Sequence, residues 1–374
     1  MGNLILSNEN KIIFAINLEV AMGNLNTMKI TSLVFAVWAL AQSSVVSATD
    51  YKTVLIHGFQ PQQLLFGSPN TVSSDGENYW ADYWGALADE RIDWPSFERV
   101  KGKIATDYVW PKLKSMSERG VCDQGCILVT HSTGDLVARY IIDNQANWLS
   151  AAGLKPLNII ATFDIAGAGG GSELADLAVN VTQGATTWNP LIELALQAWL
   201  GGPLTDKLGV LNDLKVNNAR QLAALPSDRA PRLRFVGEGD LFLGATKLFL
   251  KGKDDSVVAS HSSCGSSKAG NFGSCSSSVA FNGKISSQGD AVTSFMPNHY
   301  PMLMSDNYDH LSIILNKPKG KVTAANDTVR LDNGDTISFS TYQKDYGFWI
   351  FKTHYKYVSQ SDSQSMSKLI YNTL

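Results

Sequence analysis

The sequence predicts an α/β fold built on a mostly parallel, doubly wound sheet. Two observations carry this prediction: apolar runs end in glycine, and helical patterns separate them. Continuous apolar runs are typical of strands buried on both faces, and their alternation with helices is typical of doubly wound sheets. The runs are residues 52–58, 125–134, 156–171 and 232–240, and the helical patterns are residues 79–87, 100–119 and 134–149.

Three later segments depart from this alternation. Residues 172–226 are rich in helical patterns, and "WNPLIELALQAWL" within them places several apolar side chains on one helical face: Leu191, Leu194, Ala195, Ala198 and Trp199. We expect this insertion to be a lid or a permanent cap. Residues 259–289 are rich in Ser and Gly. Residues 328–357 are β-like, with a hairpin at Asn333-Gly334, and predict additional C-terminal strands of the same domain.

The N-terminus reads as a targeting segment. Residues 28–48 contain one lysine, a short apolar run and a Val-Ser-Ala ending, which is the pattern of a secretory signal peptide cleaved near Ala48. The run is too short for a membrane span. Residues 1–27 are interpreted as an upstream start or an extension, and an N-terminal anchor helix is the alternative. The predicted catalytic domain is therefore 49–374, without a transmembrane segment, and the protein is expected to be extracellular or periplasmic.

Composition and cysteine content agree with an exported globular protein. The 374 residues are 17% charged with a net charge of −3, which gives no basic field for nucleic acid. The four cysteines lie close in pairs, and sequence proximity favours the disulfides Cys122–Cys126 and Cys264–Cys275. A metal site using the Cys-x3-Cys spacing is the alternative. Export favours disulfides, because exported compartments are oxidising.

The segment "VTHSTGDLVARY" places Ser132 between a predicted strand and a predicted helix. A sharp strand-to-helix turn between small residues is how many hydrolases expose a serine nucleophile. Thr130 stands where the usual motif has its first glycine, and Gly134 supplies the second. The alternative is an ordinary structural turn.

An oxyanion hole is predicted beside this serine. "VLIHGF" ends the first predicted strand, and the backbone N–H groups of Phe59 and Thr133 are the natural pair of donors for the oxygen of a tetrahedral intermediate. His57 is expected to brace this loop rather than to act as a base.

Several motifs together resemble secreted bacterial true lipases of the α/β-hydrolase superfamily. "IHGF", "THSTGDLVARY", "GAGGGSELADLA", "GKDDSVVASHSSCG" and "NYDHLSI" occur in the order seen in that family, over most of residues 52–316. The resemblance implies the α/β-hydrolase fold, a nucleophile–acid–histidine order along the chain, an oxyanion hole and a lid.

The acid and the base are expected late in the chain. "KDDSVV" places the acid at Asp255, with Asp254 as the runner-up and a turn-capping role as its other interpretation. His310, in "YDHLSI", is predicted to be the base, and His299 is its competitor because the polar stretch 290–309 could bring it near the serine. Asp240 and Asp164 are weaker candidates for the acid.

No cofactor or catalytic metal is predicted. The lipase pattern "HLD" often accompanies a structural calcium ion, but Ser312 stands at the aspartate position, so calcium is doubtful; Asp290 and Asp306 are its remaining candidate ligands.

The function predicted from these residues is hydrolysis of lipid acyl esters by a secreted lipase or esterase. The expected partner is an ester substrate, at a lipid–water interface or in solution. A phospholipase, an acyltransferase and a polyester depolymerase are alternatives on the same triad. A non-catalytic binding protein on this fold is the alternative from another class, because fold does not imply function.

Overall fold

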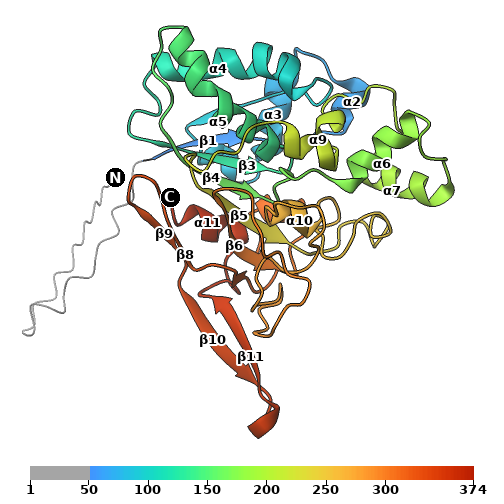
Figure 1. The fold of residues 1–374 in the computed structure, drawn as a ribbon, viewed down its shortest axis with the longest axis vertical. Helices are drawn as coiled ribbons and strands as arrows, with labels where there is room; N and C mark the ends of the chain where they lie inside the picture. Colours follow the sequence, from blue (N-terminus) through green and yellow to red (C-terminus); the bar gives the residue numbers. More distant parts are fainter. Residues whose placement is uncertain (1–50) are drawn as a thin grey trace, which may run out of the picture. The chain divides into compact units, whose positions relative to one another are not determined.

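The computed structural model describes residues 51–374, so the predicted signal peptide lies outside the described residues. A seven-stranded sheet has the order β2-β1-β3-β4-β5-β6-β7, and every neighbouring pair is parallel except β6–β7 (Figure 1). The strands are β1 (Lys52–Ile56), β2 (Glu90–Ile92), β3 (Cys126–His131), β4 (Ile159–Ile165), β5 (Arg232–Gly237), β6 (His299–Ser305) and β7 (Thr323–Ala324). The predicted mostly parallel sheet is confirmed.

Helices cover both faces of this sheet. The α-helices of six or more residues are α3 (Val72–Trp80), α4 (Trp110–Glu118), α5 (Gly134–Ala151), α6 (Glu173–Thr182), α7 (Pro190–Leu200), α9 (Val216–Gln221) and α11 (Met366–Tyr371). The other helical segments are α2 (Gln62–Phe66), η1 (Trp84–Ala86), η2 (Val100–Val109), α8 (Leu211–Leu214), α10 (Ser260–Ser263), η3 (Ser312–Ile314) and η4 (Trp349–Phe351). Within residues 51–374 no helix has the length and apolar content that a membrane crossing requires.

The apolar strands bury side chains alternately on the two faces of the sheet. In β1, Val54 and Ile56 belong to the hydrophobic core under α4 and α5, whereas Leu55 belongs to the core on the opposite face. In β3, Leu128 belongs to the core under α4 and α5, and Val129 belongs to the core on the opposite face. Because successive side chains of a strand point to opposite faces, only a strand covered on both sides needs a continuous apolar run.

One predicted loop contains a strand. The polar stretch 290–309 includes β6, which pairs in parallel with β5. Pro301 lies inside β6 and lacks a backbone N–H, and the pairing register shifts between Arg234 and Phe235 opposite it. A proline within the run hid this strand from the sequence pattern.

The insertion at residues 172–226 is helical, as predicted, and its helix ends follow from local sequence. The Ser172 hydroxyl caps α6 by accepting from the Leu174 N–H, and the Asn189 side chain caps α7 ahead of Pro190. Gly201 ends α7 with φ = 65°, the left-handed conformation that glycine adopts without penalty.

Only part of the apolar face identified on α7 is buried. Ile192, Leu196 and Trp199 are buried, whereas Leu191 and Leu194 are 56% and 55% exposed. Apolar side chains occur on both sides of this helix, so helical periodicity alone could not decide which side faces the core.

Two small hairpins follow the central sheet, as predicted for the C-terminal region. One consists of β8 (Thr328–Arg330) and β9 (Thr336–Ser338), with the turn at Asn333-Gly334. The other consists of β10 (Thr341–Tyr346) and β11 (Thr353–Val358), which extend away from the central sheet (Figure 1).

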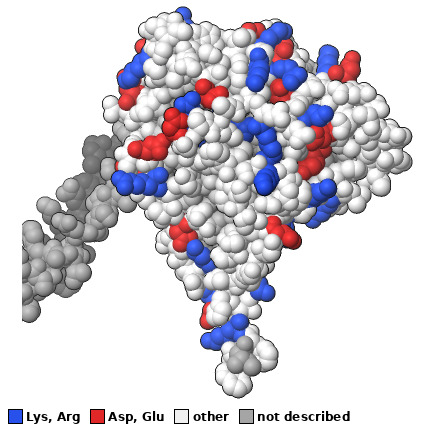
Figure 2. All heavy atoms as spheres, in the orientation of Figure 1, with Lys and Arg blue, Asp and Glu red and all other residues white. Residues whose placement is uncertain are grey.

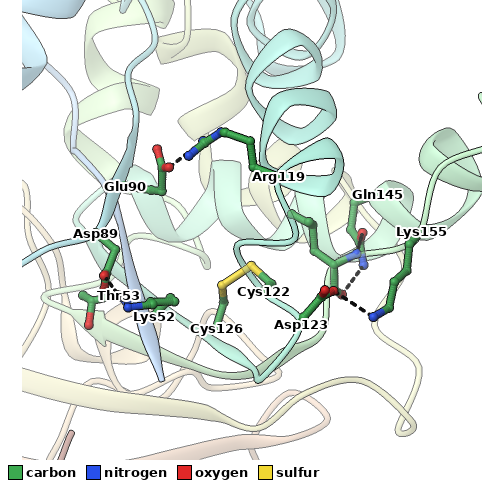
Figure 3. Close-up of a disulfide and its surroundings, with 11 residues drawn as sticks. Lys52, Thr53, Asp89, Glu90, Arg119, Cys122, Asp123, Cys126, Gln145 and Lys155 are labelled. Atoms are coloured by element: carbon green, nitrogen blue, oxygen red, sulfur yellow. Dashed lines mark hydrogen bonds and ion pairs between the residues drawn. A yellow bond between two sulfur atoms is a disulfide. The ribbon is translucent and has the colours of Figure 1, made fainter. Parts of the chain in front are cut away.

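Both predicted disulfides are formed, and residues 51–374 contain no free cysteine. The Cys122–Cys126 disulfide joins the turn that follows α4 to the first residue of β3. It lies next to the ion pairs Glu90–Arg119 and Asp123–Lys155 (Figure 3). Cys264–Cys275 spans 11 residues of the Ser/Gly-rich segment. A loop of this length corresponds to roughly 2–3 kcal/mol of stabilisation in the chain-entropy account.

Candidate active site

Ser132 lies at the carboxyl edge of the sheet, where the strand order changes direction. The chain leaves β1 for β2 on one side, then crosses to β3 on the other side of β1. Ligands in open α/β sheets bind in the crevice at such a switch point. Ser132 follows β3 directly, and its φ of 55° places a non-glycine residue in the left-handed region. This strained strand-to-helix turn is the geometry expected for an exposed nucleophile.

The small residues around Ser132 are required by close contacts. A Cβ at Gly134 would lie 2.2 Å from the Ile56 carbonyl oxygen, and a Cβ at Gly58 would lie 2.8 Å from the Ser132 Cβ. Thr130 is tolerated at the remaining motif position because its hydroxyl donates to Asp164 Oδ1 at 2.8 Å. Where the usual motif has glycine, this chain therefore has a threonine that forms a buried hydrogen bond.

The structure brings Ser132, His310 and Asp255 together. His310 Nε2 lies 2.9 Å from Ser132 Oγ, and His310 Nδ1 lies 2.8 Å from Asp255 Oδ2. The other oxygen, Asp255 Oδ1, accepts from the N–H groups of Val257 and Val258. This carboxylate therefore holds the Nδ1–H tautomer of His310, which leaves Nε2 free to accept the serine proton.

The competing candidates lie elsewhere. His299 begins β6, whereas His310 follows the end of β6, so the two histidines lie toward opposite edges of the parallel sheet. His299 Nδ1 donates to the Pro297 carbonyl, and burial together with Arg232 holds the pKa of His299 well below its usual range. His261 contacts Glu173 and Arg220. The remaining acids have structural contacts of their own.

Each of these other side chains has a hydrogen-bond partner outside the Ser132 site. Asp254 Oδ1 accepts from the Ser256 N–H, which is the predicted turn cap. Asp240 caps the turn after β5 by accepting from Phe242 and Gly244. His354 is exposed and pairs with Asp345.

The predicted oxyanion loop lies beside the serine. Phe59 and Thr133 both line the cavity that contains Ser132 and His310. Among the hydrogen bonds of residues 51–374, neither the Phe59 N–H nor the Thr133 N–H is a donor. His57 braces this loop: its Nδ1–H donates to the Gly58 carbonyl and its Nε2 accepts from the Trp94 N–H. Two unpaired N–H groups next to a serine can stabilise an oxyanion.

The cavity at this site is largely apolar and measures ≈ 340 Å³. Ser132 and His310 are each 4% exposed, and Trp199 and Leu200 of α7 contribute to the wall. The Phe59 and Trp199 rings lie 5.6 Å apart, so α7 packs directly against the oxyanion loop. Of the aromatic residues early in the chain, Tyr79 lines the cavity, whereas Trp80, Trp84 and Trp94 are buried in the core.

A second histidine fixes the backbone of His310, a contact that the sequence did not predict. His131 Nε2–H donates to the His310 carbonyl at 2.7 Å, and the Tyr79 hydroxyl donates to His131 Nδ1. On its other side, the His310 N–H donates to the Asp255 carbonyl at 3.0 Å. Burial and the neighbouring His310 hold the pKa of His131 well below its usual range, so His131 is a neutral donor. No spacing in the sequence indicates this chain of contacts.

A buried ion network lies next to the nucleophile turn and was also not predicted. Arg232 and Arg234 on β5 pair with Asp135, in the first turn of α5, and with Asp164 on β4. All four side chains are at most 4% exposed. Burial alone would raise the pKa of Asp135, but Arg234 and Arg232 hold it below its usual range.

The loop around His310 does not fit a calcium ion. The Asp309 carboxylate accepts from the Ser312 hydroxyl at 2.7 Å and from Lys319 Nζ at 3.1 Å. A lysine ammonium group already neutralises this carboxylate, and it would repel a divalent cation. Among residues 51–374 no cluster of three or more metal-ligating side chains occurs, and Asp290 and Asp306 gain no such neighbours.

Asp254 yields a prediction of pH dependence. Burial raises the pKa of Asp254 to about 6, with a smaller contribution from Asp255. Because the unfolded-state value is about 3.9, this group's contribution to stability is complete below about pH 4 and is lost as the pH rises through about 6, by on the order of 1–3 kcal/mol. In Asp254→Asn we expect that loss to disappear. Urea unfolding on both sides of this window measures it, and an unchanged pH slope would contradict the prediction.

Comparisons with known proteins give a similarity in fold. No protein-family model matches the sequence, and no curated protein matches it. Among solved structures, the mature form of the Bacillus licheniformis lipase BlEst2 is 14% identical with a TM-score of 0.41, and the match covers 71% of this chain and 87% of that lipase. The Staphylococcus hyicus lipase is 14% identical with a TM-score of 0.39, and the match covers 71% of this chain and 88% of that lipase. EstA from Clostridium botulinum is 14% identical with a TM-score of 0.40, and the match covers 73% of this chain and 85% of that protein.

Two of these three similar structures are bacterial lipases.

Proposed function

We propose that this chain is a serine hydrolase that cleaves carboxylic esters, with Ser132 as nucleophile, His310 as base and Asp255 as the acid. The observation that carries the proposal is the continuous hydrogen-bonded line from Asp255 through His310 to Ser132 Oγ, at 2.8 and 2.9 Å, beside an apolar cavity. These are the contacts that a weak hydroxyl nucleophile needs for activation.

In the proposed reaction Ser132 Oγ attacks the ester carbonyl while its proton passes to His310 Nε2. The N–H groups of Phe59 and Thr133 donate to the oxyanion, and the negative charge of Asp255 stabilises the imidazolium. His310 then gives its proton to the departing alcohol, which leaves an acyl-enzyme. Water attacks this intermediate by the same steps and releases the acid.

The proposed substrate is a lipid acyl ester. The cavity wall includes Leu200, Val257 and Leu311, which suit a hydrocarbon chain better than a polar group. The helical insertion at residues 172–226 is the proposed lid, because its residues Trp199 and Leu200 line the cavity that contains Ser132. No metal is part of the proposal, since Lys319 supplies the positive charge beside Asp309. The two disulfides support an oxidising, extracellular or periplasmic location.

Labelling with a fluorophosphonate tests this function. We expect stoichiometric modification of Ser132, in buffer containing EDTA, together with hydrolysis of p-nitrophenyl esters whose rate depends on acyl length. A protein that hydrolyses no ester and takes no label would be a binding protein on this fold. Transfer of the acyl group to an added alcohol in preference to water would instead indicate an acyltransferase.

A further inference from the structure

The tip of the β10–β11 hairpin carries exposed aromatic side chains that the proposed reaction does not use. Phe348, Trp349 and Phe351 are 85%, 73% and 79% exposed. They lie in the short connection between the strands, where the Phe351 N–H donates to the Phe348 carbonyl. Trp349 has a φ of 52°, an outlying conformation for a bulky residue. Folding alone does not explain a cluster of aromatics held in solvent, and such a patch usually marks an interaction surface.

The strands below the tip form a braced stalk. β10 and β11 pair antiparallel along their full length, from Thr341–Val358 at the base to Tyr346–Thr353 near the tip. The Tyr355 ring lies 5.3 Å from Tyr346 and 5.8 Å from Tyr357, so tyrosines line one face of the stalk. The hairpin carries its tip away from the central sheet (Figure 1).

The stalk is attached to the domain along β11. The Val358 N–H donates to the Val322 carbonyl, and the Lys356 N–H donates to the Gly283 carbonyl. Lys321 Nζ lies over the Tyr357 ring, 4.3 Å from its centre. Lys356 also pairs with Asp327. The Ile285 N–H also donates to the His354 carbonyl, so the contacts with the domain extend along β11 from Val358 to His354. The aromatic residues of the tip lie beyond them.

The charge of the hairpin is opposite in sign to that of the chain. Residues 341–358 contain three lysines and one aspartate, although the whole chain has a net charge of −3. Lys344 lies 5.0 Å from the centre of the Tyr346 ring, and the half-exposed Lys352 lies 3.8 Å from Asp345. Figure 2 shows basic side chains on the hairpin just above an uncharged tip. Trp and Phe flanked by Lys is the composition of segments that enter the interface of an anionic membrane.

We propose that this tip anchors the protein to a lipid surface containing anionic lipids. Phe348, Trp349 and Phe351 enter the boundary between head groups and acyl chains, and Lys344 and Lys352 remain at the level of the phosphates. A lipid surface fits better than a protein partner, because three aromatic side chains offer roughly 450–750 Å², below the ≈ 800 Å² that each partner of a stable interface usually buries. The anchor does not depend on the catalytic assignment.

Vesicle sedimentation tests the anchor, with the full chain in a Ser132→Ala background so that the lipid is not hydrolysed. The vesicles contain equimolar phosphatidylcholine and phosphatidylglycerol. Replacing Phe348, Trp349 and Phe351 with serine is expected to weaken binding roughly 100-fold, because each aromatic ring loses about one kcal/mol or more of burial. The matched control replaces the exposed Leu243 and Leu248, which lie outside the hairpin, and should bind like its parent.

A second variant, Lys344→Gln/Lys352→Gln, tests the charge independently of the aromatic tip. It should weaken binding to the anionic vesicles, and more so at low salt, but leave binding to pure phosphatidylcholine unchanged. With Ser132 restored, both hairpin variants should hydrolyse a soluble short-chain ester at the wild-type rate, which shows that they fold.

Three results would overturn the proposal. The first is full vesicle binding by the serine variant, and the second is loss of binding only in the Leu243/Leu248 control. The third is a wild-type dimer in sedimentation velocity that the tip substitutions convert to monomer without change in lipid affinity, which would make a second copy of this chain the occupant.

Discussion

Ser132→Ala is expected to fold like the wild type and to lose ester hydrolysis by several orders of magnitude. The substitution removes the attacking oxygen but leaves the Phe59 and Thr133 N–H groups and the apolar cavity in place. His310→Ala should cause a loss of similar size, because the serine proton then has no acceptor. The double variant should be little worse than either, since groups that act as a unit are not additive. Rates on a soluble p-nitrophenyl ester measure all three.

The acid should contribute less than the other two residues. Asp255→Asn keeps the shape of the site but no longer stabilises the Nδ1–H tautomer of His310, and we expect a loss of roughly 10²–10⁴-fold. Asp254→Asn and His299→Ala serve as controls and should remain within about tenfold of the wild type. If His299→Ala abolished activity and His310→Ala did not, the histidine would be wrongly assigned, whereas the hydrolase function would survive.

Arg234→Met is expected to destabilise the fold by roughly 3–5 kcal/mol. Arg234 is fully buried, and its guanidinium pairs with Asp135 and Asp164 and donates to carbonyls of Gly167, Ser262 and Ser263. Methionine fills much of the space but leaves two buried carboxylates facing Arg232 alone. The urea midpoint at neutral pH measures the loss.

Asp135 contributes a pH-dependent part to the stability of this network. The pKa of Asp135 is depressed in the fold, so its stabilisation is complete above the unfolded-state pKa of about 3.9 and is lost as the pH falls below it. Arg234→Met should therefore lose less stability than the wild type on acidification.

Lys155→Met is the matched control for Arg234→Met. Lys155 pairs with Asp123 at 2.8 Å, but its side chain is 66% exposed (Figure 3). Exposed pairs of this kind contribute about 0–1 kcal/mol. Equal effects of the two substitutions would mean that the buried network does not stabilise the fold as argued.

The sequence by itself determined the main strands of the sheet and the residues that meet at its edge. The runs before Gly58 and Ser132 are apolar without interruption, which only a strand buried on both faces requires. The small residues around Ser132 indicate a close backbone approach, and the two cysteine pairs lie near enough along the chain to be joined. These features are local, so a pattern along the chain can display them.

Only the tertiary structure decided what depends on distant segments. It separated His310 from His299, because His299 begins β6 and His310 follows the end of that strand. Pro301 concealed the strand in the sequence. It selected Asp255 over its neighbour through the direction of each side chain in one turn. The contacts of His131 and the pairs between β5 and the start of α5 join residues far apart in sequence. Burial gives these contacts their strength, and burial is a property of the folded chain that no local pattern contains.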